Sequence, residues 1–476
     1  MAATAKFGVI GLEVMGKNIA LNIERNGFPI AVYNRSYEKT EEFLNTRAKG
    51  LKVVGGKTLQ EFVQSLEKPR RILVMVKAGG PVDAVIDQLL PLLEKGDIII
   101  DGGNTFYPDT DRRVAKCDPT GIKFFGMGVS GGEHGALWGP SLMPGGDKDT
   151  FKHLEPILTK ISAKADGQDC VTYCGAKSAG HFVKMVHNGI EYGDMQLIAE
   201  AYDLMRFGGG LSGKEIEDTL NEWNQGELKS FLIEVTSKVV NFMDDQGTGK
   251  LLVDMIMDKA GQKGTGKWTA QVALDQAVPI PTMAAAVDAR YISGYKSIRE
   301  TVSKAFPSKL APLGGDKKAF LRQIKNALYC SKIMSYAQGF HLFQVADKEF
   351  GYGLNLGELA RIWKAGCIIR AVFLDKITQA FKSNPTLPNL ILDPYFRGEI
   401  AERVTDWRST VKTSIDLGIT SPAFVASLAY FDSLRRERLP AYIVQAQRDF
   451  FGSHTYERVD KPAGQAFHTK WTKDHN

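Results

Sequence analysis

The stretch that decides the fold is FGVIGLEVMG, residues 7–16, where a short apolar run ends at Gly11 and a second glycine follows at Gly16. A helical pattern continues from Lys17 to Glu24. A strand that leads through a glycine turn into a helix presents backbone N–H groups and a helix N-terminus to a pyrophosphate. Glu13 replaces the middle glycine of the G-x-G-x-x-G pattern, so the setting of the turn carries more weight than the pattern itself.

Apolar runs and amphipathic stretches alternate over the first 130 residues or so. We expect further strands at Ile30–Tyr33, Ile72–Val76, Ile98–Ile100 and Phe124–Val129. A helical pattern lies between the second and third of these, at Val82–Leu93. Alternating βα units predict a parallel sheet with helices on both faces, which is a Rossmann-like dinucleotide-binding domain.

From about Ala179 the pattern changes to long helical segments, expected at 181–207, 212–243 and 319–347. After Pro440 the sequence becomes polar and turn-rich, and its aromatic residues Phe450, Phe451, Phe467 and Trp471 need a surface to cover them. The predicted fold class is therefore α/β plus all-α. We expect a dinucleotide-binding domain at 1–178, a large helical domain at 179–439 and a docking tail at 440–476.

Composition excludes several classes of protein. The 476 residues are 43% hydrophobic and 24% charged, which excludes wholesale disorder. The net charge of +6 comes without a long Lys/Arg run, so we expect no nucleic-acid partner but an anionic small molecule. No apolar stretch is long enough to predict a membrane span, and the first apolar run begins too early to leave room for a leader segment.

The five cysteines are scattered along the chain and predict no disulfide framework. This usage is typical of a reducing compartment, so we expect a cytoplasmic protein. Cys170 and Cys174, with His181 and His187, match no common zinc spacing, and we expect no metal.

The second predicted strand ends at Asn34-Arg35-Ser36, about 20 residues after the glycine turn, where an NAD site places an acidic residue for the ribose hydroxyl. Arg35 instead offers a guanidinium fork to a 2′-phosphate, although a solvated arginine at a strand end is the alternative. Later strands end at Val76-Lys77-Ala78-Gly79 and Asp101-Gly102-Gly103-Asn104, in the crevice where open α/β sheets bind ligands. Arg35 and the glycine turn together favour NADP, and the small residues at the later strand ends let a nicotinamide ribose approach.

Two segments satisfy the spacing G-x-x-x-x-G-K of a phosphate-binding loop, Gly208–Lys214 and Gly261–Lys267. Glu215 and Trp268 stand where a Ser or Thr must reach magnesium, so neither segment predicts such a loop. We interpret the first as a turn between helices. The second is a loop able to present Lys263, Thr265 and Lys267 to an anion.

One helical segment carries an unusual polar stripe. Lys184, His187, Asn188, Glu191 and Tyr192 fall on one face at about 100° per residue, beside a wall made of Phe182, Val183, Val186 and Ile190. A solvent-facing stripe is the simpler interpretation. However, a base, an acid and orienting donors on one rigid element also make a catalytic site.

At this point the sequence resembles the decarboxylating 6-phosphogluconate dehydrogenase family, over Phe7 to Trp471. The resemblance rests on GVSGG at 128–132, KMVHNGIEYGDMQ at 184–196, GQKGTGKWT at 261–269 and QAQRDFFGSHTYE at 445–457. It implies conversion of 6-phosphogluconate and NADP to ribulose 5-phosphate, carbon dioxide and NADPH, without a metal. It also implies a homodimer in which the tail of one subunit threads into the other.

The resemblance also implies residue roles. Lys184 is then the general base for the C3 hydroxyl, and Glu191 the acid that protonates C1 of the enediol left after decarboxylation. Substrate-binding positions are Ser130, Gly131, Gly132, His187, Asn188, Tyr192, Lys263, Thr265, Arg290, Arg448 and His454, the last two supplied by the partner subunit. Cofactor-binding positions are Gly11, Leu12, Val14, Met15, Gly16, Asn34, Arg35, Ser36, Val76, Lys77, Ala78 and Asn104.

Three positions depart from the family pattern: Glu13 in the glycine turn, and His134 and Leu137 after GVSGG. A carboxylate near a pyrophosphate would repel it unless it points to solvent, so Glu13 bears on cofactor affinity. Two alternatives remain. Another β-hydroxyacid dehydrogenase would lack the phosphate set Lys263, Thr265, Arg290 and Arg448, and a catalytically inactive NADP-binding regulator would not need both Lys184 and Glu191.

Overall fold

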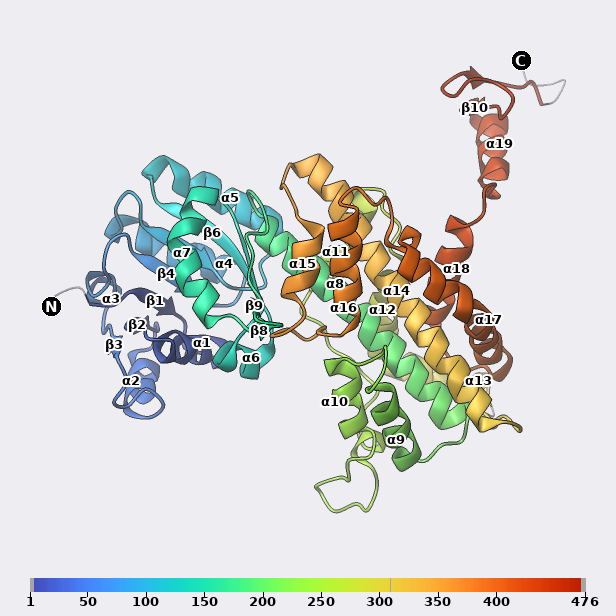
Figure 1. Cartoon of the computed structure of the whole chain (residues 1–476), viewed down its shortest axis with the longest axis horizontal. Helices are drawn as coiled ribbons and strands as arrows, with labels where there is room; N and C mark the ends of the chain where they lie inside the picture. Colours follow the sequence, from blue (N-terminus) through green and yellow to red (C-terminus); the bar gives the residue numbers. More distant parts are fainter. Residues whose placement is uncertain (1–3, 309, 472–476) are drawn as a thin grey trace. The chain divides into compact units, whose positions relative to one another are not determined.

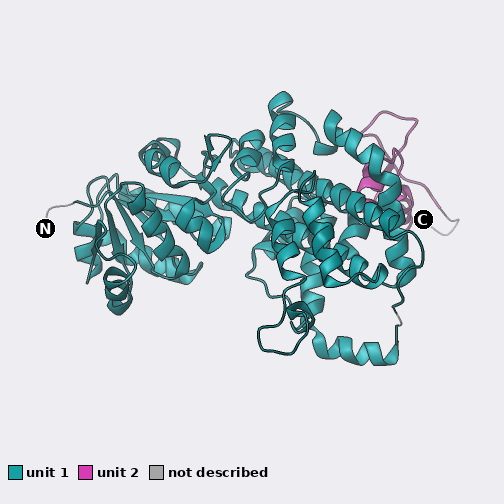
Figure 2. Cartoon of the chain, turned by 60° about the horizontal axis from the view of Figure 1, so that its bottom comes forward, with its two compact units in different colours: residues 1–427 teal, residues 428–476 magenta. Residues whose placement is uncertain are grey.

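The computed structural model describes residues 4–308 and 310–471. They form two compact units, residues 1–427 and 428–476, which Figure 2 colours separately. Each unit is described by itself below. Within the described residues, no helix has the length and apolar character needed to cross a membrane.

A seven-stranded sheet organises the first part of the chain (Figure 1). Its order is β3-β2-β1-β4-β5-β6-β7, and each neighbouring pair from β3 to β6 is parallel. The strands are β1 Phe7–Ile10, β2 Ile30–Tyr33, β3 Val53–Gly55, β4 Arg71–Val74, β5 Ile98–Asp101, β6 Lys123–Val129 and β7 Leu142–Gly145. This confirms the predicted Rossmann-like sheet, while the edge strand β7, antiparallel to β6, was not predicted.

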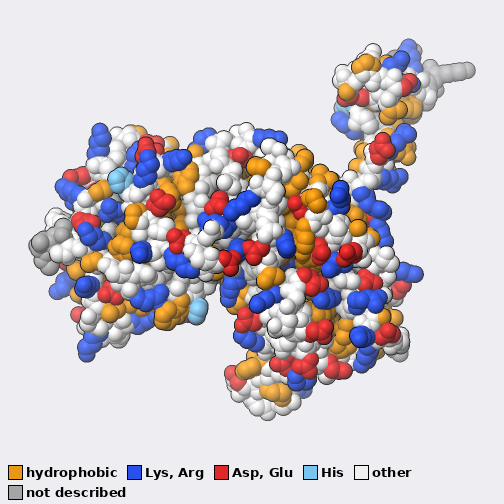
Figure 3. Space-filling model, in the orientation of Figure 1, with side chains coloured by type: hydrophobic (Ala, Val, Ile, Leu, Met, Phe, Trp, Pro, Cys, Tyr) orange, Lys and Arg blue, Asp and Glu red, His pale blue; other side chains and the backbone are white. Residues whose placement is uncertain are grey.

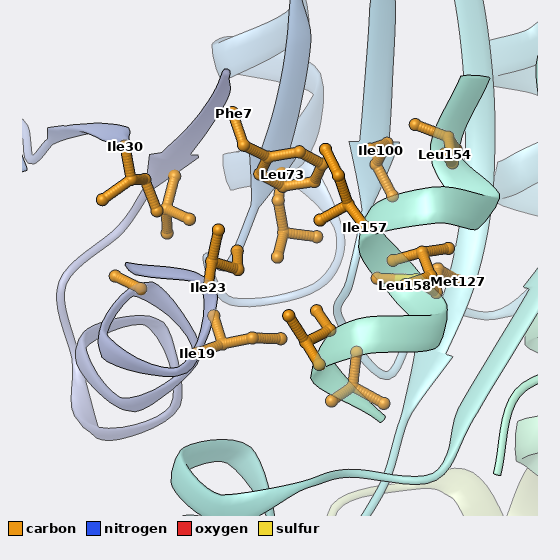
Figure 4. Packing of buried hydrophobic residues seen from close by; sticks show 14 of the residues in the cluster. Phe7, Ile19, Ile23, Ile30, Leu73, Ile100, Met127, Leu154, Ile157 and Leu158 are labelled. Atoms are coloured by element: carbon orange, nitrogen blue, oxygen red, sulfur yellow. The ribbon is translucent and has the colours of Figure 1, made fainter. Parts of the chain in front are cut away.

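Alternation along the strands places apolar side chains on both faces of the sheet. Figure 4 shows one face, where Phe7, Leu73 and Ile100 pack against Ile19 of α1 and Leu158 of α7. The opposite face packs Ile72, Val74 and Ile99 against α3, α4 and α5. The helices of this part are α1 Val14–Arg25, α2 Tyr37–Asn45, α3 Leu59–Gln64, α4 Gly80–Leu89, α5 Tyr107–Cys117, α6 Gly132–Trp138 and α7 Lys148–Ile161.

A hairpin of β8 Lys164–Ala165 and β9 Gln168–Asp169 leads into the helical part of the chain. The long helices α8 and α14 pack side by side there, and α17 packs on α14. The helices are α8 Ala179–Asp203, α9 Gly213–Trp223, α10 Phe231–Val239, α11 Thr265–Asp275, α12 Pro281–Gly294, α13 Lys296–Ala305, α14 Lys317–Phe350, α15 Leu356–Ile362, α16 Phe373–Ser383, α17 Pro394–Leu417 and α18 Pro422–Leu434.

Two helix predictions need correction. The segment expected as one helix at 212–243 is two helices, because Ser230 begins a new one by accepting a hydrogen bond from the Ile233 N–H at 3.3 Å. The helix expected over 181–207 ends at Asp203 and continues as a π-helical turn, Leu204–Gly208. Within Gly208–Lys214, residues 209–212 connect that turn to α9, which confirms the predicted turn between helices.

The tail is more regular than its composition predicts. Residues 440–471 contain a helix, α19 Ala441–Gly452, and a hairpin of β10 Tyr456–Glu457 and β11 Ala466–Phe467. The buried Asp449 carboxylate accepts hydrogen bonds from the Thr455 N–H at 3.0 Å and the Trp471 indole N–H at 2.8 Å. One carboxylate therefore joins the helix to the hairpin, while Phe450 and Phe451 are exposed within this unit.

Candidate active site

The predicted polar stripe lies along α8 and is buried. Lys184 is 6% exposed, His187 is fully buried, and the Glu191 side chain is 21% exposed. The alternative of a solvent-facing stripe is therefore wrong. An amphipathic pattern shows that two faces differ, but only tertiary packing decides which of them is covered.

Burial shifts the pKa values of Lys184 and Glu191 in opposite directions. Desolvation lowers the pKa of Lys184, against the opposing charge of Glu191. Desolvation also raises the pKa of the Glu191 carboxyl, against the charges of Lys184 and Arg290. These shifts run toward a neutral amine, which can accept a proton, and toward a protonated carboxyl, which can donate one.

His187 links these groups. Its Nδ1 lies 3.5 Å from Lys184 Nζ, 3.0 Å from Asn188 Oδ1 and 3.8 Å from Glu191 Oε2. Burial, together with the nearby Lys184 charge, holds the pKa of His187 well below its usual range. Among the residues that the structure describes, its Nε2 and the Ser130 Oγ are buried polar atoms without a hydrogen-bond partner, as expected where a polar ligand binds.

Glycines allow neighbouring elements to approach the polar face. A Cβ at Gly128 of β6 would lie 2.5 Å from Lys184 Cβ, and one at Gly189 of α8 would lie 2.6 Å from Thr269 of α11. This close approach explains why α8 keeps glycines in its interior. It brings Thr265, the first residue of α11, to within 3.1 Å of Asn188, whose amide donates to the threonine hydroxyl.

The sequence prediction missed two residues that enclose the site from elsewhere in the chain. Trp363 packs edge-on against the His187 ring, with centroids 5.3 Å apart. Cys367 is buried close to Lys184, and burial raises the pKa of its thiol to about 12, so it stays protonated. Neither residue has a local sequence signal, because each lies between helices without periodic context.

The glycine turn has the shape of a pyrophosphate cradle. Gly11 has φ of +96°, and a Cβ there would lie 2.5 Å from the Met75 carbonyl oxygen. A Cβ at Gly16 would lie 1.8 Å from the Gly11 carbonyl oxygen, so the helix can begin this close to the strand only with glycine. The Leu12 N–H donates to Asn34 Oδ1 at 3.2 Å, which joins the turn to the end of β2.

Arg35 follows β2, is exposed, and has no hydrogen-bond or ion-pair partner among the described residues. Glu13, the departure from the glycine pattern, is also exposed and pairs with Lys39 of α2. That contact lowers the pKa of the Glu13 carboxyl. The Glu13 carboxylate therefore lies in solvent beside a cationic partner, and both features reduce its repulsion of a pyrophosphate at the turn.

The remaining predicted residues are less tightly gathered. Gly131 and Gly132 follow Ser130 at the start of α6, and Arg290 of α12 stacks over the Tyr192 ring at 3.6 Å. The exposed predicted residues within 1–427 include Val14, Ser36, Lys77, Asn104 and Lys263, while Met15, Val76 and Ala78 are partly buried. Arg448 and His454 are exposed within 428–476. Among the described residues, no three His, Cys, Asp or Glu side chains group as a metal site requires.

A parallel sheet with a glycine cradle, followed by a helix that buries a lysine and a glutamate together, defines a dinucleotide-dependent dehydrogenase. Two family models match the chain: "NAD binding domain of 6-phosphogluconate dehydrogenase" over residues 6–175, and "6-phosphogluconate dehydrogenase, C-terminal domain" over residues 180–471. The chain belongs to the 6-phosphogluconate dehydrogenase family.

Similar proteins agree with this assignment. A "6-phosphogluconate dehydrogenase, decarboxylating" from Synechococcus elongatus is 56% identical, over 98% of this chain and 100% of the relative. One from Spinacia oleracea is 52% identical, over 99% of both chains. The solved Plasmodium falciparum 6-phosphogluconate dehydrogenase, described in its apo form and in complex with NADP+ and with 6-phosphogluconate, superimposes with a TM-score of 0.95. It is 47% identical and the match covers 98% of this chain and 100% of that one.

Proposed function

We propose that this protein oxidises 6-phosphogluconate and decarboxylates it to ribulose 5-phosphate and carbon dioxide, with reduction of NADP to NADPH. The observation that carries the proposal is the buried pair Lys184 and Glu191, whose pKa values are displaced toward a neutral amine and a protonated carboxyl. This reaction needs one base and one acid on the same substrate. The solved relative described with both ligands supports the same chemistry.

In the first step, Lys184 Nζ removes the proton of the C3 hydroxyl, which lets the C3–O bond become a carbonyl. NADP, when bound, supplies the acceptor for the hydride that leaves C3. Lys184 is then an ammonium and donates to the new carbonyl oxygen. Because this carbonyl is β to the carboxylate, the ammonium stabilises the negative charge that develops on the oxygen as carbon dioxide leaves.

In the second step, Glu191 donates its proton to the substrate C2, which becomes C1 of the product. Its burial favours the protonated form that this step requires. The unpartnered Ser130 Oγ and His187 Nε2 are available to the substrate's carboxylate and hydroxyls. Asn188, Gly131, Gly132, Tyr192, Lys263, Thr265 and Arg290 would complete the substrate site, the last four toward its phosphate.

The chain's own residues fit NADP. The cradle at Gly11 and Gly16 would accept a pyrophosphate. Arg35, which pairs with no described residue, would bind a 2′-phosphate together with Asn34 and Ser36. Leu12, Val14, Met15, Val76, Lys77, Ala78 and Asn104 would line the rest of the cofactor site. Five unpaired cysteines support a reducing compartment, and we propose the cytoplasm.

Absorbance at 340 nm tests the function directly. With 6-phosphogluconate and NADP, the purified protein should form NADPH and release carbon dioxide in equal amounts. Gluconate, which lacks the phosphate, is the matched control and should be turned over far more slowly. Absence of NADPH formation with 6-phosphogluconate would refute the proposal.

Replacing Lys184 by Ala should greatly slow NADPH formation while 6-phosphogluconate still binds, because the base for the C3 hydroxyl is lost. Loss of a general base typically costs about 10²- to 10⁴-fold in rate. The measurement is kcat, with substrate binding followed by calorimetry. Turnover close to that of the unmodified protein would show that Lys184 is not the base.

Glu191→Gln keeps the size of the side chain but cannot donate the proton. It should slow formation of ribulose 5-phosphate by about 10²- to 10⁴-fold while binding of substrate and NADP is kept. Rapid quenching and product analysis measure this rate. If ribulose 5-phosphate forms at the normal rate, another group supplies the proton.

We also propose a homodimer in which Arg448 and His454 of one subunit complete the partner's substrate site. The exposed aromatic residues of the tail unit support a docked tail. Mixing the inactive variants Lys184→Ala and Arg448→Ala tests this. Random pairing makes half of the dimers mixed, and tails in trans leave each mixed dimer one intact site of two, so about a quarter of the activity should return. No recovery, despite demonstrated subunit exchange, would contradict the trans arrangement.

A further inference from the structure

Arg113 of α5 is a fully buried arginine that the reaction itself does not use. Its Nη2 donates to the Gly79 carbonyl oxygen at 3.0 Å, in the loop that follows β4. Its Nη1 donates to Asp101 Oδ2 at 3.2 Å, at the end of β5. Its Nε donates to Asp83 Oδ1 at 2.8 Å, at the start of α4. One guanidinium therefore connects two strand-end loops on the same side of the sheet.

Asp101 extends this connection through both its side chain and its backbone. Its carboxylate accepts the Gly103 N–H at 2.9 Å and the Thr105 hydroxyl at 2.7 Å, which shapes the loop that carries Asn104. Its carbonyl oxygen lies 3.1 Å from His181 Nε2. His181 Nδ1 in turn lies 2.6 Å from the Thr110 hydroxyl of α5.

His181 connects the network to the catalytic helix. It is buried and lies three residues, about one turn of α8, before Lys184. The chain of contacts therefore runs from the loops after β4 and β5, through Arg113 and Asp101, to the helix that holds the proposed base.

This network is costly to bury, because removing charged groups from water is compensated only when every charge is paired and hydrogen-bonded. Arg113 meets that condition with two carboxylates and a carbonyl. The Asp83 contacts are strong enough to lower the pKa of that carboxyl to about 2. Burial of this kind favours one arrangement of the loops over alternatives.

We propose that Arg113 is a positioning residue, which holds the cofactor loops after β4 and β5 in register with Lys184. The inference rests on the proposed function. Hydride and proton leave one C3–O–H unit for two different acceptors, so the nicotinamide and Lys184 Nζ must be placed together within a fraction of an ångström. Arg113 acts on this geometry without touching the substrate.

The proposal predicts that Arg113→Lys weakens one part of the cofactor site selectively. Lysine keeps the charge but cannot reach Gly79, Asp83 and Asp101 together. NADP should bind about tenfold more weakly, since it reaches the loops after β4 and β5. Adenosine 2′,5′-bisphosphate lacks the nicotinamide half of NADP and depends mainly on the glycine turn and Arg35, so it should bind within about twofold of normal. Calorimetry measures both affinities without turnover.

Arg112 provides a matched control. It donates to the same Asp83 carboxylate at 3.1 Å, but its side chain is 52% exposed and reaches neither loop. Arg112→Lys should leave both affinities and kcat unchanged. The primary isotope effect on kcat with substrate deuterated at C3 gives a second measurement, and it should rise for Arg113→Lys because hydride transfer becomes slower.

Two results for Arg113→Lys would overturn the proposal. An equal loss of affinity for both ligands would indicate general destabilisation of the domain. Unchanged affinity for NADP would show that Arg113 has no positioning role. If Arg113→Lys does not fold, Thr105→Val removes a single hydrogen bond to Asp101 at almost constant volume and should show the same selectivity in smaller degree. Failure of the unmodified protein to oxidise 6-phosphogluconate would instead refute the proposed function. That result is distinct from the binding results that test the role of Arg113.

Discussion

The site depends on the exclusion of water from one face of α8. In water at neutral pH, a lysine and a glutamate are both charged. Burial penalises each charged form more than the partner's charge favours it, so desolvation is the larger effect on both groups. The roles proposed for Lys184 and Glu191 therefore depend on their surroundings, because neither side chain has the required protonation in water.

Close packing produces that exclusion. Gly128, Gly189 and Gly193 each lie where a side chain would collide with a neighbour, respectively Lys184, Thr269 and Ser335. β6, α11 and α14 can therefore approach α8 closely. The parallel sheet supplies the glycine turn, and the helical part supplies the proposed acid and base. On the face of the molecule in Figure 3, basic and acidic side chains are interspersed, so no uniformly basic patch covers it.

Much of this arrangement was predictable from sequence, because its signals are local. The strand-turn-helix at Phe7–Gly16 and the stripe from Lys184 to Tyr192 are periodic patterns with a direct structural meaning. The burial of the stripe, the separate helices α9 and α10, and the ordered tail could not be predicted from such patterns, since each depends on distant partners. Trp363 reaches His187, and Asp449 reaches Trp471, only after the chain has folded.

The hydrogen bonds of Asp449 have a consequence for association. The helix α19 and the hairpin of the tail are joined through this carboxylate within residues 428–476 themselves. A segment that is ordered before it meets a partner loses less conformational entropy on binding than a disordered one. In the proposed homodimer such tails would dock as preformed segments, and the rate of assembly would be set by encounter and orientation instead of by folding of the tail.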